Sequence, residues 1–296
     1  KIFFDYNIKK KYFKTMKKIE QNKIMCSKWF QSLRNLICKE IEALEEGSVK
    51  FKRKKWFRNP NGSENMGGGE MSVLRGDTFE KAGVNISTVF GSISTNLKGK
   101  IPGTDNYNKF WASGISVVIH PFSPKIPAVH MNTRHIITKK SWFGGGMDIT
   151  PTDLKSKESE KLAEYFHDNL KKICEENKKG SYKEYKKWCD EYFFLPHRNE
   201  PRGLGGIFYD YLNSKNWEND FNFTKKVGET FINSYKTIVS RTKNKKWNEK
   251  DKDLQLHRRS RYTEFNLLHD RGTKFGLQTN GNIDAILMSL PPSTGW

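Results

Sequence analysis

One stretch of alternating residues carries the side chains best suited to acid–base and anion-binding chemistry. It runs from Gly114 to Thr138, GISVVIHPFSPKIPAVHMNTRHIIT, and its three prolines predict two strands with a turn between them. Because strand side chains alternate between faces, His130, Asn132 and Arg134 share one face of the second strand. Histidine transfers protons near neutral pH, and arginine binds carboxylates through a planar fork. The row therefore predicts either a pocket with an acid–base group and an anion clamp or an ordinary solvated sheet face.

Three further segments carry polar groups. WFGGGMDITP, residues 142–151, has three consecutive glycines that let backbone approach a partner closely, but it does not match a nucleotide-binding loop. From the residues alone, Asp148 is expected either to accept hydrogen bonds from a ligand or to cap a turn, and the cap is favoured. YFFLPHRNEPRGLGGIFY, residues 192–209, predicts a loop that leads into a buried strand. Further on, a strand is expected to end at Asp270, and TNGN at 279–282 predicts a hairpin turn.

The cysteines and histidines do not show the spacing of a metal site. The four cysteines lie 12, 136 and 15 residues apart and form no C-x-x-C pair. Cys174 and Cys189 fall in helical patterns, which favours buried thiols in a reducing compartment. The histidines include no tight ligand pair, so we expect no bound metal.

The elements that must position these residues are strands at both ends of the sequence and helices in the middle. Apolar residues recur every three or four positions over 13–46, which predicts one long helix ended by Gly47. The basic stretch 50–69 predicts a loop, and strands follow from Glu70. The remaining predictions are helices at 156–179, 181–192, 222–243 and 249–260 and strands at 205–211 and 261–270. This order is not a βαβ alternation, so it predicts an α+β domain with a mainly antiparallel sheet.

Charge alone leaves several functions open. The chain has 53 Lys and Arg against 33 Asp and Glu, a net charge of +20, and residues 1–60 hold 17 and 6 of them, a net +11. Nucleic-acid binding, attraction of an anionic substrate and a Lys- and Asn-rich composition each explain such an excess. No RNP-type aromatic motif supports an RNA-binding module. No run of 18 uncharged apolar residues occurs, so no membrane-spanning helix is expected.

Five segments together resemble one family, the oxygen-dependent coproporphyrinogen III oxidases of haem biosynthesis. They are GGGEMSVLRGDTFEKAGVNISTVFG, ASGISVVIHPFSPKIPAVHMNTR, SWFGGGMDITP, YKKWCDEYFFLPHRNEPRGLGGIFYD and RRSRYTEFNLLHDRGTKFGLQTNGNIDAILMSLPP. They occur in the family's order. The resemblance therefore implies a catalytic region over 67–296, preceded within the same domain by a basic helix and loop over 1–66.

The resemblance implies the oxidative decarboxylation of two propionate groups of coproporphyrinogen III to vinyl groups, with molecular oxygen as oxidant and protoporphyrinogen IX as product. It also implies a single domain with a large, flat antiparallel sheet covered on both faces by helices, a homodimer, and no organic cofactor or metal. Family members occur in the cytosol or in mitochondria, and without a recognisable presequence we expect the cytoplasm. A non-catalytic porphyrin-binding relative and a basic RNA-binding module are the alternatives.

Residue roles follow from the same resemblance. His130 occupies the position of the family's proposed proton donor. Asp270 lies where the family has an aspartate that faces the pyrrole N–H groups, next to Arg271. With Arg134, these are the residues implied to act in catalysis.

The implied substrate contacts are Ser116, Asn132, Thr133, Arg134, Asp148, Asn280, Gly281 and Asn282. The last three form a turn that usually ends in Arg in the family. Asn282 is therefore a departure, and Arg271 or a lysine is expected to replace that propionate clamp. Four histidines also match histidines of the family, and we expect them to bind no metal: His120, His130, His167 and His197.

Overall fold

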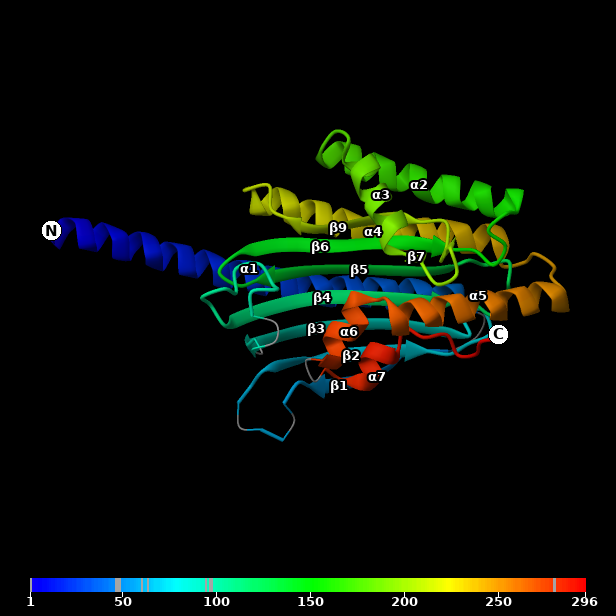
Figure 1. Ribbon diagram of the computed structural model, residues 1–296, viewed down its shortest axis with the longest axis horizontal. Coiled ribbons are helices and arrows are strands. Elements are labelled where there is room, and N and C mark those ends of the chain that lie inside the picture. The colour runs from blue at the N-terminus through cyan, green and yellow to red at the C-terminus, as the bar shows by residue number, and fades with distance from the viewer. Residues whose placement is uncertain are drawn as a thin grey trace.

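In the computed structural model, seven antiparallel strands form one sheet with helices on both faces (Figure 1). In sheet order the strands are β1 (Lys52–Phe57), β2 (Gly67–Leu74), β3 (Lys81–Ser92), β4 (Lys109–His120), β5 (Ala128–Ile137), β6 (Ser141–Thr150) and β9 (Gly206–Leu212). A small hairpin of β7 (Phe194–Leu195) and β8 (Glu200–Pro201) precedes β9. The structure describes residues 2–45, 49–59, 61–62, 64–93, 95, 98–278 and 281–296, with the backbone alone for 2–14 and 278. The predicted α+β class and its large antiparallel sheet are confirmed.

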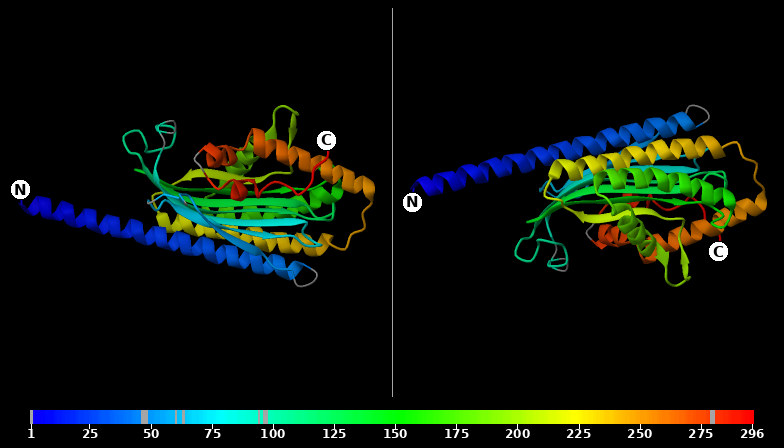
Figure 2. Two further views of the ribbon diagram at one scale, coloured as in Figure 1. Left: turned by 90° about the horizontal axis from the view of Figure 1, so that it is seen from below. Right: turned by 90° about the horizontal axis from the view of Figure 1, so that it is seen from above.

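The helices divide between the two faces of the sheet. Helices α1 (Ile2–Leu44) and α4 (Trp217–Thr242) cover one face, and α5 (Glu249–Leu268), α6 (Arg271–Gln278) and α7 (Ile283–Leu287) lie over the other (Figure 2). Helix α2 (Lys157–Asn177) packs on α4, and α3 (Ser181–Tyr192) packs on β9. The N-terminal part of α1 extends beyond the sheet (Figure 2).

Strand alternation gives the two faces different chemistry. Val117, Val129 and Met131 are buried in the core shared with α1 and α4. Each such side chain contributes about 1.5–3 kcal/mol to folding through burial. The residues between them point to the side of α5–α7, and the strand register sets one row across five strands: Asn85, Ser116, Asn132, Gly146 and Phe208. The polar row predicted on β5 thus lies on a sheet face that helices cover.

Two predictions of local structure are wrong. The stretch 50–69 is not a loop, because it contains β1 and the start of β2; the first four residues of β1 are exposed Lys or Arg, as suits the edge of a sheet. The proposed boundary between residues 66 and 67 accordingly falls inside a hairpin of the sheet. Residues 261–270 do not form a strand, because α5 continues to Leu268. Tyr262 and Phe265 are buried at helical spacing on that helix, and Arg261 pairs with Glu264 one turn away at 3.1 Å.

The other element boundaries differ by less. Helices α1 and α4 begin earlier than predicted, at Ile2 and Trp217. Gly47, the expected end of α1, lies outside the described residues. The first two residues of the turn predicted at 279–282 lie outside the described residues. The elements that flank it are helices and not the strands of a hairpin: α6 ends at Gln278 and α7 begins at Ile283.

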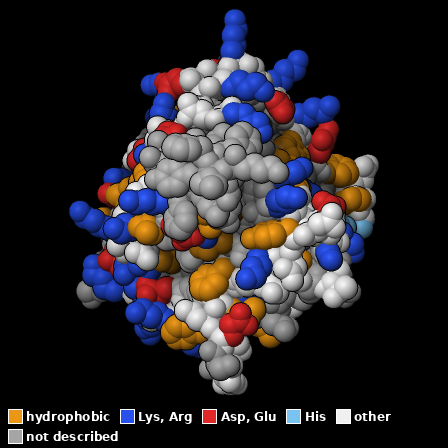
Figure 3. All heavy atoms as spheres, turned by 90° about the vertical axis from the view of Figure 1, so that its left-hand side faces the viewer, with side chains coloured by type: hydrophobic (Ala, Val, Ile, Leu, Met, Phe, Trp, Pro, Cys, Tyr) orange, Lys and Arg blue, Asp and Glu red, His pale blue; other side chains and the backbone are white. Residues whose placement is uncertain are grey.

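On one side of the molecule (Figure 3), the positive charge is dispersed and not gathered into a single patch. On the face shown in Figure 3, Lys and Arg side chains lie over much of the surface and acidic side chains lie among them. Among the described residues, no helix is both long and apolar enough to cross a membrane.

Candidate active site

His130 is held by a buried carboxylate on the neighbouring strand. The register places Asp148 of β6 opposite His130 of β5, and Nδ1 of His130 lies 2.8 Å from Oδ1 of Asp148. The other carboxylate oxygen of Asp148 accepts an N–H of the fully buried Arg202. Burial raises the pKa of Asp148, but Arg202 and His130 lower it more, so the pKa lies below the usual range for aspartate. Asp148 is therefore a buried carboxylate that orients His130, and its predicted role as a turn cap is wrong.

Aromatic rings surround the guanidinium of Arg202 in place of water. Its guanidinium carbon lies 3.9 Å from the ring centre of Phe193, 4.6 Å from that of Tyr262 and 5.0 Å from that of Phe265. Such cation–π contacts partly replace the lost hydration of a buried cation. His130 also packs edge-on against Phe193, with ring centres 5.8 Å apart. The same aromatic cluster thus surrounds both ends of the His130–Asp148–Arg202 triad.

The polar row continues on the other side of His130. The amide nitrogen of Asn132 lies 3.2 Å from Nε2 of His130, and Arg134 donates from Nη1 to the amide oxygen of Asn132 at 3.0 Å. Arg134 also donates from Nη2 to Asp210 of β9 at 2.8 Å. Gly144 of β6 lies beneath this ion pair: a Cβ there would collide with the Asp210 carboxylate and lie 3.0 Å from Nη2 of Arg134. The first glycine of the triplet therefore leaves room for the Arg134–Asp210 pair.

Asp270 lies on the helical side of the site, directly before α6. One of its oxygens accepts the backbone N–H of Thr273 at 2.6 Å, and the other accepts the hydroxyl of Tyr192 at 2.8 Å. Burial raises the pKa of Tyr192 to about 12, so the phenol stays protonated and donates. Tyr192 stacks on Phe208 of β9 with ring centres 4.6 Å apart. Asp270 is therefore tied to the same sheet face as His130.

Arg271 lies beside this contact. Its backbone N–H donates to the Tyr192 hydroxyl at 3.1 Å, its guanidinium carbon is 4.9 Å from the Tyr192 ring centre, and its side chain is exposed. The charged end is thus close to Asp270 and open to a ligand.

Of the eight expected substrate contacts, the structure brings Ser116, Asn132, Arg134 and Asp148 to one sheet face. Ser116 lies directly across from Asn132. Thr133 does not join them, because alternation along β5 turns its side chain into the core on the opposite face, where it is fully buried. Asn282 caps α7, accepting the N–H of Ala285 at 2.9 Å, and Gly281 precedes it. Asn280 lies outside the described residues.

The remaining matched histidines lie apart from one another in the structure. His120 pairs with the carbonyl of Ser289, His167 with that of Leu204, and His197 with the carboxylate of Glu264. Burial lowers the pKa of His120 to about 3, so this side chain is neutral. Within the part of the chain that the structure describes, no group of three or more His, Cys, Asp or Glu residues is arranged to hold a metal ion. All four cysteines are free and buried.

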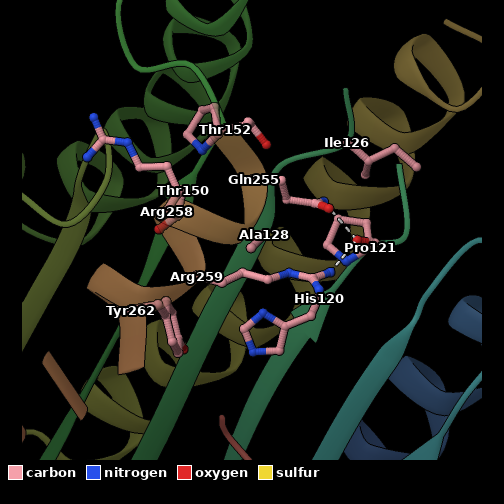
Figure 4. A pocket seen from close by; sticks show the side chains of 11 residues that line it. His120, Pro121, Ile126, Ala128, Thr150, Thr152, Gln255, Arg258, Arg259 and Tyr262 are labelled. Atoms are coloured by element: carbon pink, nitrogen blue, oxygen red, sulfur yellow. Dashed lines mark hydrogen bonds between the residues drawn. The ribbon is translucent and has the colours of Figure 1, made fainter. Parts of the chain in front are cut away.

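A small cavity adjoins the site where β4 ends and β5 begins (Figure 4). Ala128 lines it on the same face as His130, and Tyr262 of α5 lies between it and Arg202. At its rim, Gln255 and Arg259 both donate to the backbone carbonyl of Pro121 at 3.0 Å. These bonds fix α5 over the ends of the strands, and so fix the aromatic rings that α5 supplies to Arg202.

Sequence analysis missed Arg202 and Asp210 as site residues. Arg202 lies in the segment 192–209 that is predicted to be a loop leading into a buried strand, and Asp210 directly follows it. Their sequence positions give no sign of which residues they contact. The one available signal was the density of arginine around Arg202 in an otherwise aromatic and glycine-rich segment.

Comparisons with known proteins identify the family that this chain resembles. Residues 25–296 match the family model described as coproporphyrinogen III oxidase. Over 280 residues, the chain is 51% identical to the oxygen-dependent coproporphyrinogen-III oxidase of Rickettsia bellii, covering 94% of this chain and 99% of the relative. It is 53% identical to the protein of the same name from Rickettsia akari and 52% identical to that from Rickettsia rickettsii, each over 92% of this chain and 97% of the relative.

The buried ion pair makes a prediction about stability. Arg202→Met should lower the free energy of unfolding by roughly 3–5 kcal/mol, because it leaves the Asp148 charge buried without its partner. Adding Asp148→Asn should recover part of that loss. Urea denaturation at neutral pH measures both. Arg241→Met is the matched control, since Arg241 is exposed and stacks on Tyr165 at 4.4 Å, and it should cost less than about 1 kcal/mol.

The pH dependence has a defined sign. Because folding lowers the pKa of Asp148, its charge stabilises the fold above the ordinary aspartate pKa, and this contribution is lost as the pH falls through the lower pKa of the folded state. The stability difference between wild type and the double variant should therefore shrink in acid. Equal losses for Arg202→Met and Arg241→Met at neutral pH would contradict this account.

Proposed function

The chain belongs to the coproporphyrinogen III oxidase family, and we propose that its reaction takes place at one series of hydrogen-bonded side chains, together with Asp270 and Arg271. The series consists of Arg202, Asp148, His130, Asn132, Arg134 and Asp210. The protein is an oxidoreductase of haem biosynthesis. It catalyses the oxygen-dependent decarboxylation of two propionate groups of coproporphyrinogen III to vinyl groups. The observation that supports this site best is the hydrogen-bonded row itself, in which an acid–base group and an anion clamp share one sheet face.

The chemistry requires a proton donor. Each propionate loses carbon dioxide, two electrons and one proton as its vinyl group forms. Oxygen takes up those two electrons and two protons and leaves as hydrogen peroxide. One proton per propionate must therefore come from outside the substrate, and we assign this transfer to His130, which Asp148 holds in place.

Arginines hold the negatively charged substrate. Coproporphyrinogen III carries four carboxylates, and a guanidinium binds a carboxylate through two parallel hydrogen bonds. The Arg134 side chain is 30% exposed, and Arg271 is exposed beside Asp270. We assign the reacting propionate to this pair, with Ser116 and Asn132 next to Arg134. The net charge of +20 favours encounter with such an anion.

Asp270 orients the ring. Its carboxylate is fixed by Thr273 and Tyr192. A fixed carboxylate that accepts pyrrole N–H groups stabilises the positive charge that develops in the ring as electrons leave it. Oxygen then reacts with the activated pyrrole directly, so that neither a metal nor an organic cofactor takes part.

The first prediction concerns activity and cofactors. Incubated with coproporphyrinogen III in air, the chelator-treated protein should form protoporphyrinogen IX at the rate of untreated protein, read as porphyrin by fluorescence chromatography. An anaerobic incubation is the control and should give no product. Activity that disappears on chelation and returns with added metal would contradict the cofactor proposal. Failure of correctly folded protein to give product in air would contradict the assignment of the reaction to this chain.

The second prediction concerns Asp270. Asp270→Asn should lower kcat by about 10²-fold while raising KM far less, because the charge acts mainly as the transition state develops. Asparagine still accepts the N–H of Thr273, so the start of α6 is preserved. Asp253→Asn, the same change at an exposed position of α5, is the control and should leave kcat unchanged. If thermal unfolding showed that Asp270→Asn is destabilised enough to account for the fall in kcat, the proposed role of Asp270 would be ruled out.

A further proposal concerns assembly. We propose that the protein is a homodimer that associates through the stretch after Arg261. In its support, Leu267 and Leu268 at the end of α5 are 48% and 52% exposed. Light scattering should give twice the monomer mass, and Leu268→Lys should reduce it. A concentration-independent monomer mass in the wild type would refute the proposal.

A further inference from the structure

Asn132 lies between Arg134 and His130, and the donors and acceptors of these three side chains allow only one arrangement of the hydrogen bonds. A guanidinium only donates, so Asn132 must offer its amide oxygen to Arg134, as the 3.0 Å contact shows. This turns the amide nitrogen of Asn132 toward Nε2 of His130, 3.2 Å away. An amide nitrogen also only donates, so Nε2 must accept and carries no proton. The proton of the neutral imidazole is therefore on Nδ1, which faces Asp148 at 2.8 Å.

This arrangement opposes protonation of His130. A proton on Nε2 would face the amide nitrogen of Asn132, which sets two donors against each other. Turning the amide around would satisfy His130 but would set its nitrogen against Nη1 of Arg134. As long as Arg134 holds Asn132, a protonated His130 thus loses one hydrogen bond at one place or the other.

The charged groups around His130 are paired with partners of opposite charge, so the amide of Asn132 is the group that decides whether His130 takes up a proton. From β6, Asp148 faces His130, and Arg202 neutralises Asp148. Along β5, Arg134 is neutralised by Asp210 of β9. From the helices, Cys189 of α3 lies near Asp148 and Tyr262 of α5 lies against Arg202, and burial raises the pKa of both groups, which keeps them neutral. Phe193 contributes only the edge of its ring.

We propose that a substrate carboxylate, by binding Arg134, releases the amide of Asn132 to turn and present its oxygen to a protonated His130. The inference rests on the proposed function and extends it, since it names the step that loads the proton donor. Arg134 has two partners, the charged Asp210 and the neutral Asn132. A carboxylate carries a full negative charge and can accept two parallel hydrogen bonds from a guanidinium, whereas the neutral amide of Asn132 accepts one, so the arriving carboxylate displaces the amide.

The step balances. Solvent supplies one proton to Nε2 of His130 when the amide turns, and His130 later gives that proton to the reduced oxygen. One such cycle serves each propionate. In this scheme Asn132 is a positioning residue, because it acts through His130 and couples the filling of Arg134 to the protonation of the donor.

The test is an NMR titration of protein labelled with ¹⁵N-histidine, with and without coproporphyrin III. This oxidised porphyrin carries the same propionates and is used as a non-reacting probe. Without it, the neutral form of wild-type His130 should carry its proton on Nδ1. At saturating porphyrin, confirmed by absorbance, the pKa of His130 should rise by about one unit or more.

Two variants of equal charge separate the amide from simple electrostatics. Asn132→Asp accepts from Arg134 and from a protonated His130 at once, so His130 should titrate at higher pH without the probe and the further rise on binding should be small. Ala128→Asp places the same charge two residues from His130 on the same face of β5, on the side away from Asn132, and keeps the amide. Its rise on binding should match that of the wild type.

Several outcomes would overturn the inference. A proton on Nε2 in the ligand-free wild type would do so, and so would no porphyrin-dependent rise in the wild type or an equal rise in the two variants. If Ala128→Asp binds no porphyrin, an Asn132→Asp rise as large as that of the wild type is decisive instead. These readouts need no turnover. A protein that shows the coupling but forms no protoporphyrinogen IX would therefore contradict the proposed function and leave the coupling intact.

Discussion

The site depends on one buried ion pair, between Asp148 and Arg202. Burying two charges costs several kcal/mol for each ion unless the partners and their surroundings compensate. Here Arg202 is compensated by Asp148 on one side and by the rings of Phe193, Tyr262 and Phe265 on the other. The pair in turn keeps Asp148 ionised, and Asp148 fixes the ring of His130. The helix α5, the turn before β9 and the face of β6 are thus all needed for one imidazole to point correctly.

A rigid sheet and a helical cover contribute different parts of the site. The row on β5, β6 and β9 is set by backbone register, so its acid–base and anion-binding groups are held at fixed spacing. Asp270 comes from the start of a short helix and is joined to the sheet through Tyr192 and its stacking on Phe208. In the proposed reaction, the sheet side handles the propionate and the proton, while the helical side orients the ring. This division matches the two tasks of an oxidative decarboxylation, which must remove a carboxylate and withdraw electrons from the ring.

Local sequence patterns correctly predicted the features that depend on neighbouring residues. They failed for features that depend on contacts between residues far apart in the sequence. Alternation placed His130, Asn132 and Arg134 on one face, and the structure agrees. Asp210 and Arg202 escaped notice because cross-strand partners follow from long-range register, which no local pattern records. The segment 261–270 is predicted as a strand, whereas α5 continues to Leu268, where the tertiary burial of Tyr262 and Phe265 favours helix. The resemblance placed Thr133 with its neighbours in one motif, but a sequence motif does not separate the two faces of a strand.

Neutron diffraction of the ligand-free protein tests the central claim most directly, because it locates the deuterium atoms on His130, Asn132 and Asp148. The account predicts deuterium on Nδ1 of His130, between it and an ionised Asp148, and none on Nε2. It also predicts that the amide of Asn132 has its nitrogen toward His130 and its oxygen toward Arg134. Deuterium on Nε2 of His130, or on a carboxyl oxygen of Asp148, would show that the buried ion pair does not set the state of the imidazole and would contradict the account.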